Sequence, residues 1–156
     1  MDETTYIIVA EKHMASFFRI ACSIVGNRQD AEDAVQQMLL SAWRYRLKAH
    51  PDAERAWMMR ILINECRSLL RRKRRTIPME EVPVASMPHD AQNAALREAI
   101  RSLPWSLRTP LLLKYMEGMS EKEVAAAMHI PVSSVKGRLF RARKLLKAQL
   151  NEEVES

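Results

Sequence analysis

Apolar residues recur every three to four positions through nearly all of this 156-residue chain. This is the period of an amphipathic α-helix, whereas a half-buried β-strand alternates apolar and polar residues. No sustained alternation occurs, and neither Asn-Gly nor Asp-Gly, the usual hairpin turns, is present. Only three glycines interrupt the pattern. The sequence therefore predicts an all-α fold.

Three helices are predicted in the first half of the chain, over Thr4–Ile24, Asp30–Arg44 and Ala53–Arg74. Gly26 is expected to end the first of them, because glycine adopts the left-handed conformation that closes many helices. The second helix should turn one apolar face inward, made of Val35, Met38, Leu39, Ala42 and Trp43.

Three prolines within Thr76–His89 end this pattern. We predict a linker over residues 76–89 between two small domains, 1–75 and 90–150, followed by a tail at 151–156. A semi-extended linker also argues against a fixed interface between the domains. In the second domain, Pro110 falls inside a predicted helix and is expected to bend or delay it.

Composition narrows the functional classes. Twenty-five Lys and Arg against nineteen Asp and Glu give a net charge of +6, which favours a polyanionic partner. Cys22 and Cys66 lack the spacing of a metal knuckle, the four histidines are not at ligand spacing, and no glycine-rich phosphate loop occurs. We expect no catalytic residue, metal or cofactor. The short N-terminal apolar run is neither a signal peptide nor a membrane span, so we expect a cytoplasmic protein.

The segment after Gly118 has the pattern of a helix-turn-helix. Ser120 and Glu123 form a capping box, which predicts the start of a helix. This helix cannot continue through His129-Ile130-Pro131. In the next helix the residues Val135, Leu139, Ala142 and Leu146 fall within a narrow stripe. Six basic residues and no acidic one occur from Lys136 to Lys147. A helix face that carries only basic and no acidic residues favours a major-groove recognition helix over an ordinary basic surface helix.

Two further stretches carry a family resemblance. Residues 26–37, read as GNRQDAEDAVQQ, resemble a signature of extracytoplasmic-function (ECF) sigma factors of the sigma-70 family. The second stretch is made up of residues 103–104, 111–125 and 135–144, which resemble the second domain of the same family. The resemblance implies a subunit that binds core RNA polymerase and directs promoter-specific initiation. The first domain would dock on the β′ clamp helices and capture the single-stranded −10 element, while the second would bind the duplex −35 element.

The resemblance also assigns candidate residues, named here by their positions in this chain. Contacts to polymerase would come from Asp30, Glu32, Asp33, Gln36, Leu39 and Leu40. Contacts to the −10 strand would come from Arg55, Trp57, Arg60, Asn64, Arg67 and Arg71. Contacts to the −35 duplex would come from Ser133, Ser134, Lys136, Gly137, Arg138, Phe140, Arg141, Arg143 and Lys144. An anti-sigma factor is a further expected partner.

The −10 helix has independent support from charge. Residues 55–75 hold eight basic residues against the single acid Glu65, the pattern of a phosphate track. Trp57 could stack on a base. Its spacing with Met58 and Ile61 favours a role in the core instead. A stand-alone helix-turn-helix repressor or activator remains the alternative function. The chain departs from the family at Ser68, where Asp is common, at Gly137, where Ser is frequent, and at Pro110.

Overall fold

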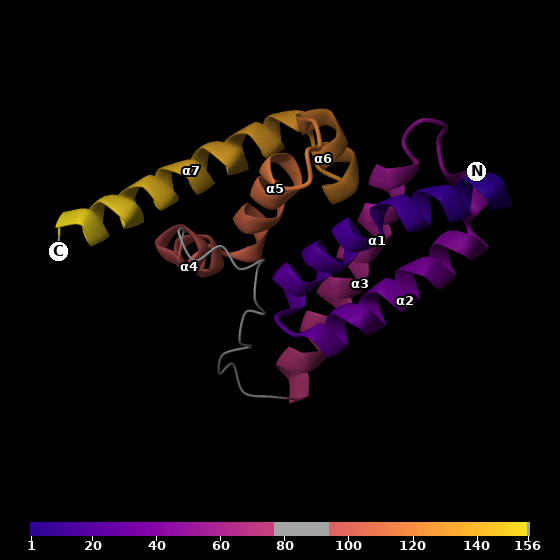
Figure 1. The fold of residues 1–156 in the computed structure, drawn as a ribbon, viewed down its shortest axis with the longest axis horizontal. Helices are drawn as coiled ribbons and strands as arrows, with labels where there is room; N and C mark the ends of the chain where they lie inside the picture. The colour runs from indigo at the N-terminus through magenta and orange to yellow at the C-terminus, as the bar shows by residue number, and fades with distance from the viewer. Residues whose placement is uncertain (77–93, 156) are drawn as a thin grey trace.

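The computed structural model describes residues 1–76 and 94–155 (Figure 1). The described part is helical throughout, with no strand, so the all-α prediction is confirmed. The predicted linker over 76–89 lies almost entirely outside the described residues. In chain order the elements are α1 (Glu3–Val25), α2 (Arg28–Arg44), the 3-10 turn η1 (Arg46–Lys48), α3 (Glu54–Thr76), α4 (Ala94–Ser102), α5 (Trp105–Tyr115), α6 (Glu121–Met128) and α7 (Val132–Glu155).

The first three helices pack against one another in all three pairings. Polar residues set their ends. The Asp2 side chain accepts a hydrogen bond from the Thr5 amide at 2.7 Å, and Gly26 closes α1 with φ 84°. Asn27 then caps α2 by accepting from the Asp30 amide at 2.9 Å. The largest fully buried side chains of this group are Phe17, Ile20, Val25, Met38, Met58, Met59 and Leu62.

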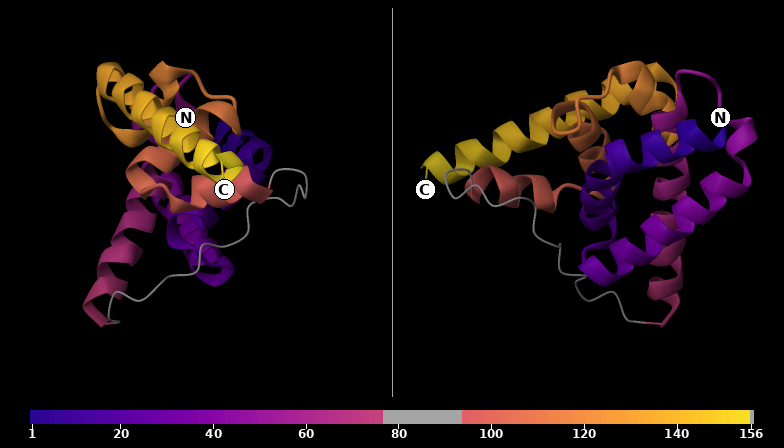
Figure 2. Two further views of the ribbon diagram at one scale, coloured as in Figure 1. Left: turned by 90° about the vertical axis from the view of Figure 1, so that its left-hand side faces the viewer. Right: turned by 45° about the vertical axis from the view of Figure 1, so that its right-hand side comes forward.

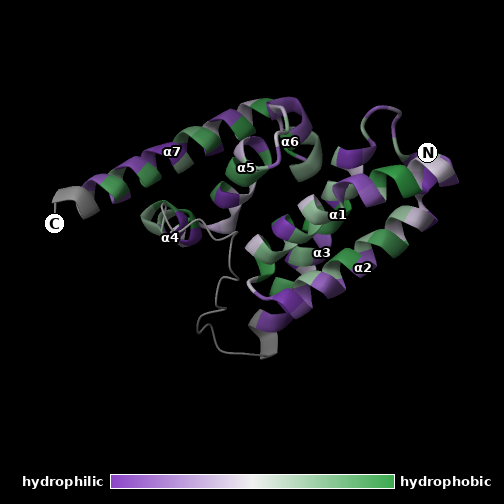
Figure 3. Ribbon diagram, in the orientation of Figure 1, coloured by the Kyte–Doolittle hydropathy of each residue, from purple (hydrophilic) through white to green (hydrophobic). Residues whose placement is uncertain are grey.

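The last four helices form a second packed group, in which α7 contacts α4, α5 and α6. Figure 1 shows α7 crossing α5 and α6 before its C-terminal half reaches α4. At that far end the Ser102 hydroxyl donates to the Gln149 amide oxygen at 2.9 Å. Hydrophilic residues alternate with hydrophobic ones along α7, as in a helix buried on one side (Figure 3).

The two groups share one hydrophobic core. Helices α5 and α6 lie against α1 and α3 (Figure 2), and the buried apolar residues of both groups form a single cluster. Polar contacts cross the same interface: the Arg108 guanidinium, 7% exposed, donates to the Ser23 carbonyl oxygen at 2.6 Å. The prediction that no fixed interface joins the domains is therefore wrong, because α5 and α6 pack directly on α1 and α3 whatever the composition of the linker.

Two local expectations also need correction. Trp43 is expected inside, but it is 39% exposed, with its ring edge-on to Tyr6 and the Arg46 guanidinium 4.0 Å from the ring centre. At the end of α2 the partners of Trp43 are thus a second ring and a cation. Pro110 is expected to bend or delay its helix, and the delay does not occur, since α5 runs from Trp105 to Tyr115 with Pro110 inside it.

Candidate nucleic-acid and polymerase interfaces

The helix-turn-helix predicted from the capping box is present. The Ser120 hydroxyl accepts from the Glu123 amide at 3.1 Å, and the Glu123 carboxylate accepts from the Ser120 amide at 3.1 Å. His129 ends α6 in the left-handed conformation, with φ 56°. Pro131 follows, and α7 starts at once at Val132. The turn is therefore short, and it holds α7 across the end of α6.

One side of α7 is buried and the other is open. Val135, Leu139, Ala142 and Leu146 are buried, as their spacing predicts. The opposite side exposes a mixed basic and aromatic surface, in which Phe140 is 61% exposed. The exposed residues among the predicted −35 contacts are Ser133, Lys136, Gly137, Phe140, Arg141, Arg143 and Lys144. This face combines positive charge with few large side chains at its N-terminal end, which suits close approach to a DNA groove.

Two basic residues of α7 already have protein partners. Arg138 is half-buried, and its Nη1 atom donates to the Ser106 carbonyl oxygen at 3.3 Å. Arg143 is exposed, and its Nη1 atom donates to the Tyr115 hydroxyl at 2.7 Å. Ser134 is half-buried. Lys136, Phe140, Arg141 and Lys144 are the large side chains that remain exposed on this face besides Arg143.

On α3 the predicted −10 residues share a stripe. Asn64, Arg67 and Arg71 are spaced three and four residues apart, which places them on one side of the helix, and all three are exposed. Arg60 continues the stripe and is half-buried. Trp57 is half-buried and packs against the core cluster, which favours the core interpretation of this residue.

Two members of this set contact the C-terminal helices. Arg55 donates through Nη2 to the Glu117 carbonyl oxygen at 2.6 Å. The Arg67 guanidinium lies 5.1 Å from the centre of the Trp105 ring, a cation–π arrangement. In this arrangement of the chain two arginines of the basic track, Arg55 and Arg67, are therefore in contact with the second group of helices.

The predicted polymerase-docking residues of α2 divide into two kinds. Glu32, Asp33, Gln36 and Leu40 are exposed, and Leu40 is 65% exposed. Leu39 is half-buried, and its carbonyl oxygen accepts from the Tyr6 hydroxyl at 2.7 Å. The outward members form an acidic and amide surface that includes one apolar side chain.

Asp30 belongs to an internal network instead. Its carboxylate pairs with Lys73 of α3 and accepts from the Asn27 amide group at 2.8 Å. Burial by itself would raise the pKa of Asp30, but hydrogen bonds from Lys73 and Asn27 lower it overall. The residue holds the start of α2 against α3, so it is occupied within the chain.

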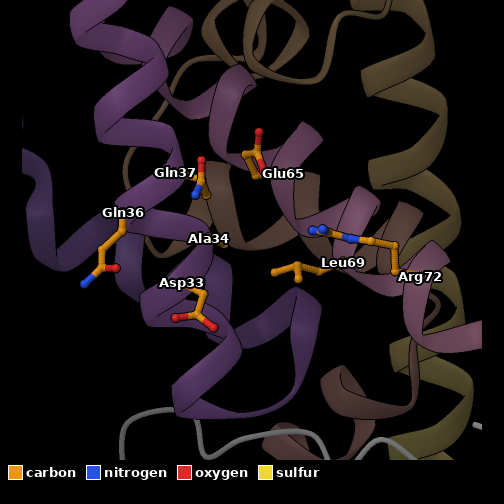
Figure 4. Close-up of a pocket in the computed structure, with 7 residues that line it drawn as sticks. All are labelled: Asp33, Ala34, Gln36, Gln37, Glu65, Leu69 and Arg72. Atoms are coloured by element: carbon orange, nitrogen blue, oxygen red, sulfur yellow. The ribbon is translucent and has the colours of Figure 1, made fainter. Parts of the chain in front are cut away.

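A groove of about 440 Å³ separates the exposed side of α2 from α3. Figure 4 shows Gln36 pointing away from α3, while the Arg72 side chain extends across Leu69 toward α2. The residues that line the groove are Asp33, Ala34, Gln36, Gln37, Glu65, Leu69 and Arg72. The groove borders both the predicted docking surface and the basic stripe of α3.

The interface between the two groups of helices is not predicted by the sequence. Its main polar members are Arg19, Arg108 and Glu117, and Glu117 is buried. In the sequence, Glu117-Gly118 indicates only a helix end. No periodicity marks a residue that becomes buried by contact with a helix almost a hundred positions away.

Two kinds of site are absent from the described residues. Among residues 1–76 and 94–155 no group of three His, Cys, Asp or Glu side chains could hold a metal ion. No described helix combines the length and apolar character needed to cross a membrane.

Comparison with known proteins gives consistent matches for both groups of helices. Residues 9–76 match the family described as Sigma-70 region 2, and residues 93–146 match Sigma-70, region 4. The RNA polymerase sigma factor SigV of Bacillus subtilis (strain 168) is 28% identical over 146 residues, covering 90% of this chain and 88% of SigV. The ECF RNA polymerase sigma factor SigM of Mycobacterium tuberculosis is 33% identical over 150 residues, covering 93% and 76%.

Two solved structures resemble this chain across both groups of helices. The sigma factor RpoE of Bartonella quintana, in complex with the anti-sigma factor NepR, superposes with a TM-score of 0.76 at 25% identity, covering 91% of this chain and 94% of that one. CnrH, in complex with the cytosolic domain of CnrY, gives a TM-score of 0.71 at 26% identity, covering 97% and 90%. The similarity therefore includes the way the two groups of helices are placed together.

Proposed function

Since the chain belongs to the ECF sigma factors of the sigma-70 family, we propose that its two groups of helices divide promoter recognition between them. As a sigma factor the chain binds core RNA polymerase and directs promoter-specific transcription initiation. Its family consists of specificity subunits of transcription, and we assign it no catalytic residue. We propose domain boundaries at 1–75 and 90–150, which the two matched regions support.

We propose that α2 is the polymerase-docking helix. The support comes from the exposed Glu32, Asp33, Gln36 and Leu40, an acidic surface in a chain of net charge +6. The β′ clamp helices are the expected partner within the family. Asp30 acts indirectly in this scheme, because its pairing with Lys73 holds the start of α2 in place.

We propose that the stripe on α3 binds the unpaired −10 strand. Asn64 is the candidate for reading a base, since its exposed amide can both donate and accept. Arg67 and Arg71 would hold the strand through its phosphates. Because Arg55 and Arg67 contact the second group of helices, separation of the two groups would release these two arginines for the strand.

We propose that α7 enters the major groove at the −35 element. Lys136, Phe140 and Arg141 are the candidates for base contacts, because they lie exposed and opposite the buried stripe of the helix. Exposed Arg143, at the edge of this face, and exposed Lys144, nearer its C-terminal end, are the candidates for phosphate contacts. The exposed N-terminal Ser133 leaves room for the DNA backbone.

An anti-sigma factor is the proposed regulatory partner. Among the solved structures that resemble the chain, RpoE of Bartonella quintana is in complex with the anti-sigma factor NepR, and CnrH is in complex with the cytosolic domain of CnrY. The resemblance extends over both groups of helices. An anti-sigma factor that stabilises this joined arrangement would keep Arg55 and Arg67 in contact with the second group of helices. Since promoters and polymerase are cytoplasmic in bacteria, we also propose the cytoplasm as the site of action.

The observation that carries the proposal is the presence, in one chain and in family order, of an acidic exposed helix, a basic stripe and a helix-turn-helix. Run-off transcription with core polymerase on a library of genomic fragments tests it. We expect specific start sites only when the chain is added. Binding to duplex promoter DNA with no dependence on core polymerase would instead indicate the stand-alone repressor or activator.

A further inference from the structure

Pro110 leaves one carbonyl group of α5 without its usual partner. In an α-helix each N–H donates to the carbonyl four residues earlier. Pro110 lies inside α5 and has no N–H, so it cannot donate to the Ser106 carbonyl. A helix that keeps a proline in its interior needs another donor at that point or loses stability.

The donor in this chain comes from α7. Arg138 Nη1 lies 3.3 Å from the Ser106 carbonyl oxygen, and α5 packs against α7. Arg138 is only half-buried and stands beside the buried Val135 and Leu139. Its guanidinium therefore turns back toward the protein, while Lys136 and Arg141 on the same helix remain exposed.

We propose that Arg138 is a positioning residue for the recognition helix, in partnership with Pro110 and Ser106. This proposal rests on the −35 function proposed for α7, and it changes the role of one residue within it. Arg138 supplies the hydrogen bond that Pro110 cannot make and thereby ties α7 to α5. The tie sets the angle at which Lys136, Phe140 and Arg141 are presented to DNA.

The partnership can be measured without DNA, on the full chain. We compare the unfolding equilibria of Arg138→Ala, Pro110→Ala and the double variant by urea denaturation. Arg138→Ala should lower the folding constant roughly tenfold, as expected for loss of a charge-assisted hydrogen bond. In the Pro110→Ala background the loss should fall below about twofold, because the backbone N–H gained at position 110 can donate to Ser106. Equal losses in the two backgrounds would overturn the proposal.

The effect on DNA binding separates positioning from direct contact. We measure binding to a duplex pool randomised at −35 in the presence of core polymerase. Arg138→Ala should lower the affinity for the preferred sequences about five- to tenfold. The dependence of affinity on salt should stay unchanged, because no phosphate contact is lost. Arg138→Gln, which keeps a donor but no charge, should retain most of the binding. Lys12→Ala on α1 is the matched control for loss of one positive charge, and it should bind normally.

Two outcomes of the DNA-binding experiment contradict the proposal. The first is a fall of about one, in both Arg138 variants, in the slope of the logarithm of the binding constant against the logarithm of the salt concentration, which would mark a phosphate contact. The second is relaxed preference at a single base position, which would mark a base contact. If the wild-type chain shows no −35 preference at all, the proposed function of α7 fails, while the urea cycle still decides whether Arg138 and Pro110 are coupled.

Discussion

Arg19 in α1 and Glu117, which follows α5, form a two-pronged ion pair across 98 positions of sequence. Arg19 Nε donates to one carboxylate oxygen at 2.9 Å, and Nη2 contacts the other oxygen. The Glu117 side chain is 1% exposed, whereas the Arg19 side chain is 38% exposed. A buried carboxylate thus depends on one arginine of the other group of helices, and the hydrogen bond to Glu117 raises the pKa of Arg19.

Replacing Arg19 should loosen the joined arrangement. Arg19→Ala leaves the Glu117 carboxylate without its main partner, at a cost of about 1–3 kcal/mol in the free energy of unfolding. We expect a larger radius of gyration in small-angle X-ray scattering. Arg28→Ala, which breaks the exposed Arg28–Glu32 pair, is the control and should cost under about 0.5 kcal/mol. An unchanged scattering profile for Arg19→Ala would mean that the apolar contacts alone hold the groups together.

Charge reversal on α2 should abolish polymerase binding. Asp33→Arg combined with Gln36→Ala removes two exposed members of the docking surface without touching the core, so the helical circular-dichroism signal should persist. Co-purification with core polymerase is the measurement. Glu98→Arg, on an exposed position of α4, is the matched control and should bind as the wild type does. Normal binding by the α2 variant would remove the docking assignment.

Loss of the Asn64 amide should change −10 recognition. Because Asn64 is exposed on α3, Asn64→Ala should leave the stability within about 0.5 kcal/mol. Transcription from duplex promoters should fall, with altered preference at one −10 position. The decisive comparison uses a pre-melted bubble of varied sequence. If wild type and variant bind every bubble equally, the base-reading role is wrong.

Arg141→Ala should weaken −35 binding roughly ten- to a hundredfold, since a good bidentate base contact contributes about 1–3 kcal/mol of discrimination. The loss should relax preference at one base position of a randomised −35 duplex. A uniform loss across all sequences would identify Arg141 as a phosphate contact. Binding assays with core polymerase on the randomised pool distinguish the two.

Gly137 should show opposite effects on stability and on DNA binding. Among the described residues, no atom outside the adjoining residues and backbone of α7 lies within 4 Å of where a Cβ would stand, so packing does not require glycine there. Gly137→Ala should therefore raise the free energy of unfolding by about 0.5–1 kcal/mol, because glycine is unfavourable inside helices. The added methyl group should weaken −35 binding if DNA approaches closely at this point. Ala148→Gly on the same helix is the converse control and should lower stability by a similar amount.

The sequence predicts features that are set by residues close together in the chain, and it misses those that depend on contacts between distant segments. The helix ends at Gly26 and Ser120 and the buried stripe containing Leu139 follow from local chemistry, so their prediction is confirmed. The prediction for Trp43 is wrong because the end of α2 meets Tyr6 of α1, a contact that helix period does not encode.

At the candidate sites the sequence does not predict which basic residues contact other parts of the protein. Sequence treats every arginine of a basic helix alike, yet Arg138 meets a carbonyl and Arg67 a tryptophan ring. Both partners are supplied by other helices. Net charge and period thus indicate which helices are candidates for DNA binding. Only the packing shows which of their arginines have partners in other helices.

The single core that joins the two groups of helices has a consequence for measured affinities. If promoter binding needs the groups apart, only the separated fraction of the chain is competent, and the apparent dissociation constant is the intrinsic one divided by that fraction. A change at Arg19, on neither proposed DNA surface, would then tighten promoter binding by enlarging that fraction. A ligand that prefers the joined state would act as a competitive inhibitor without touching a single DNA-binding residue.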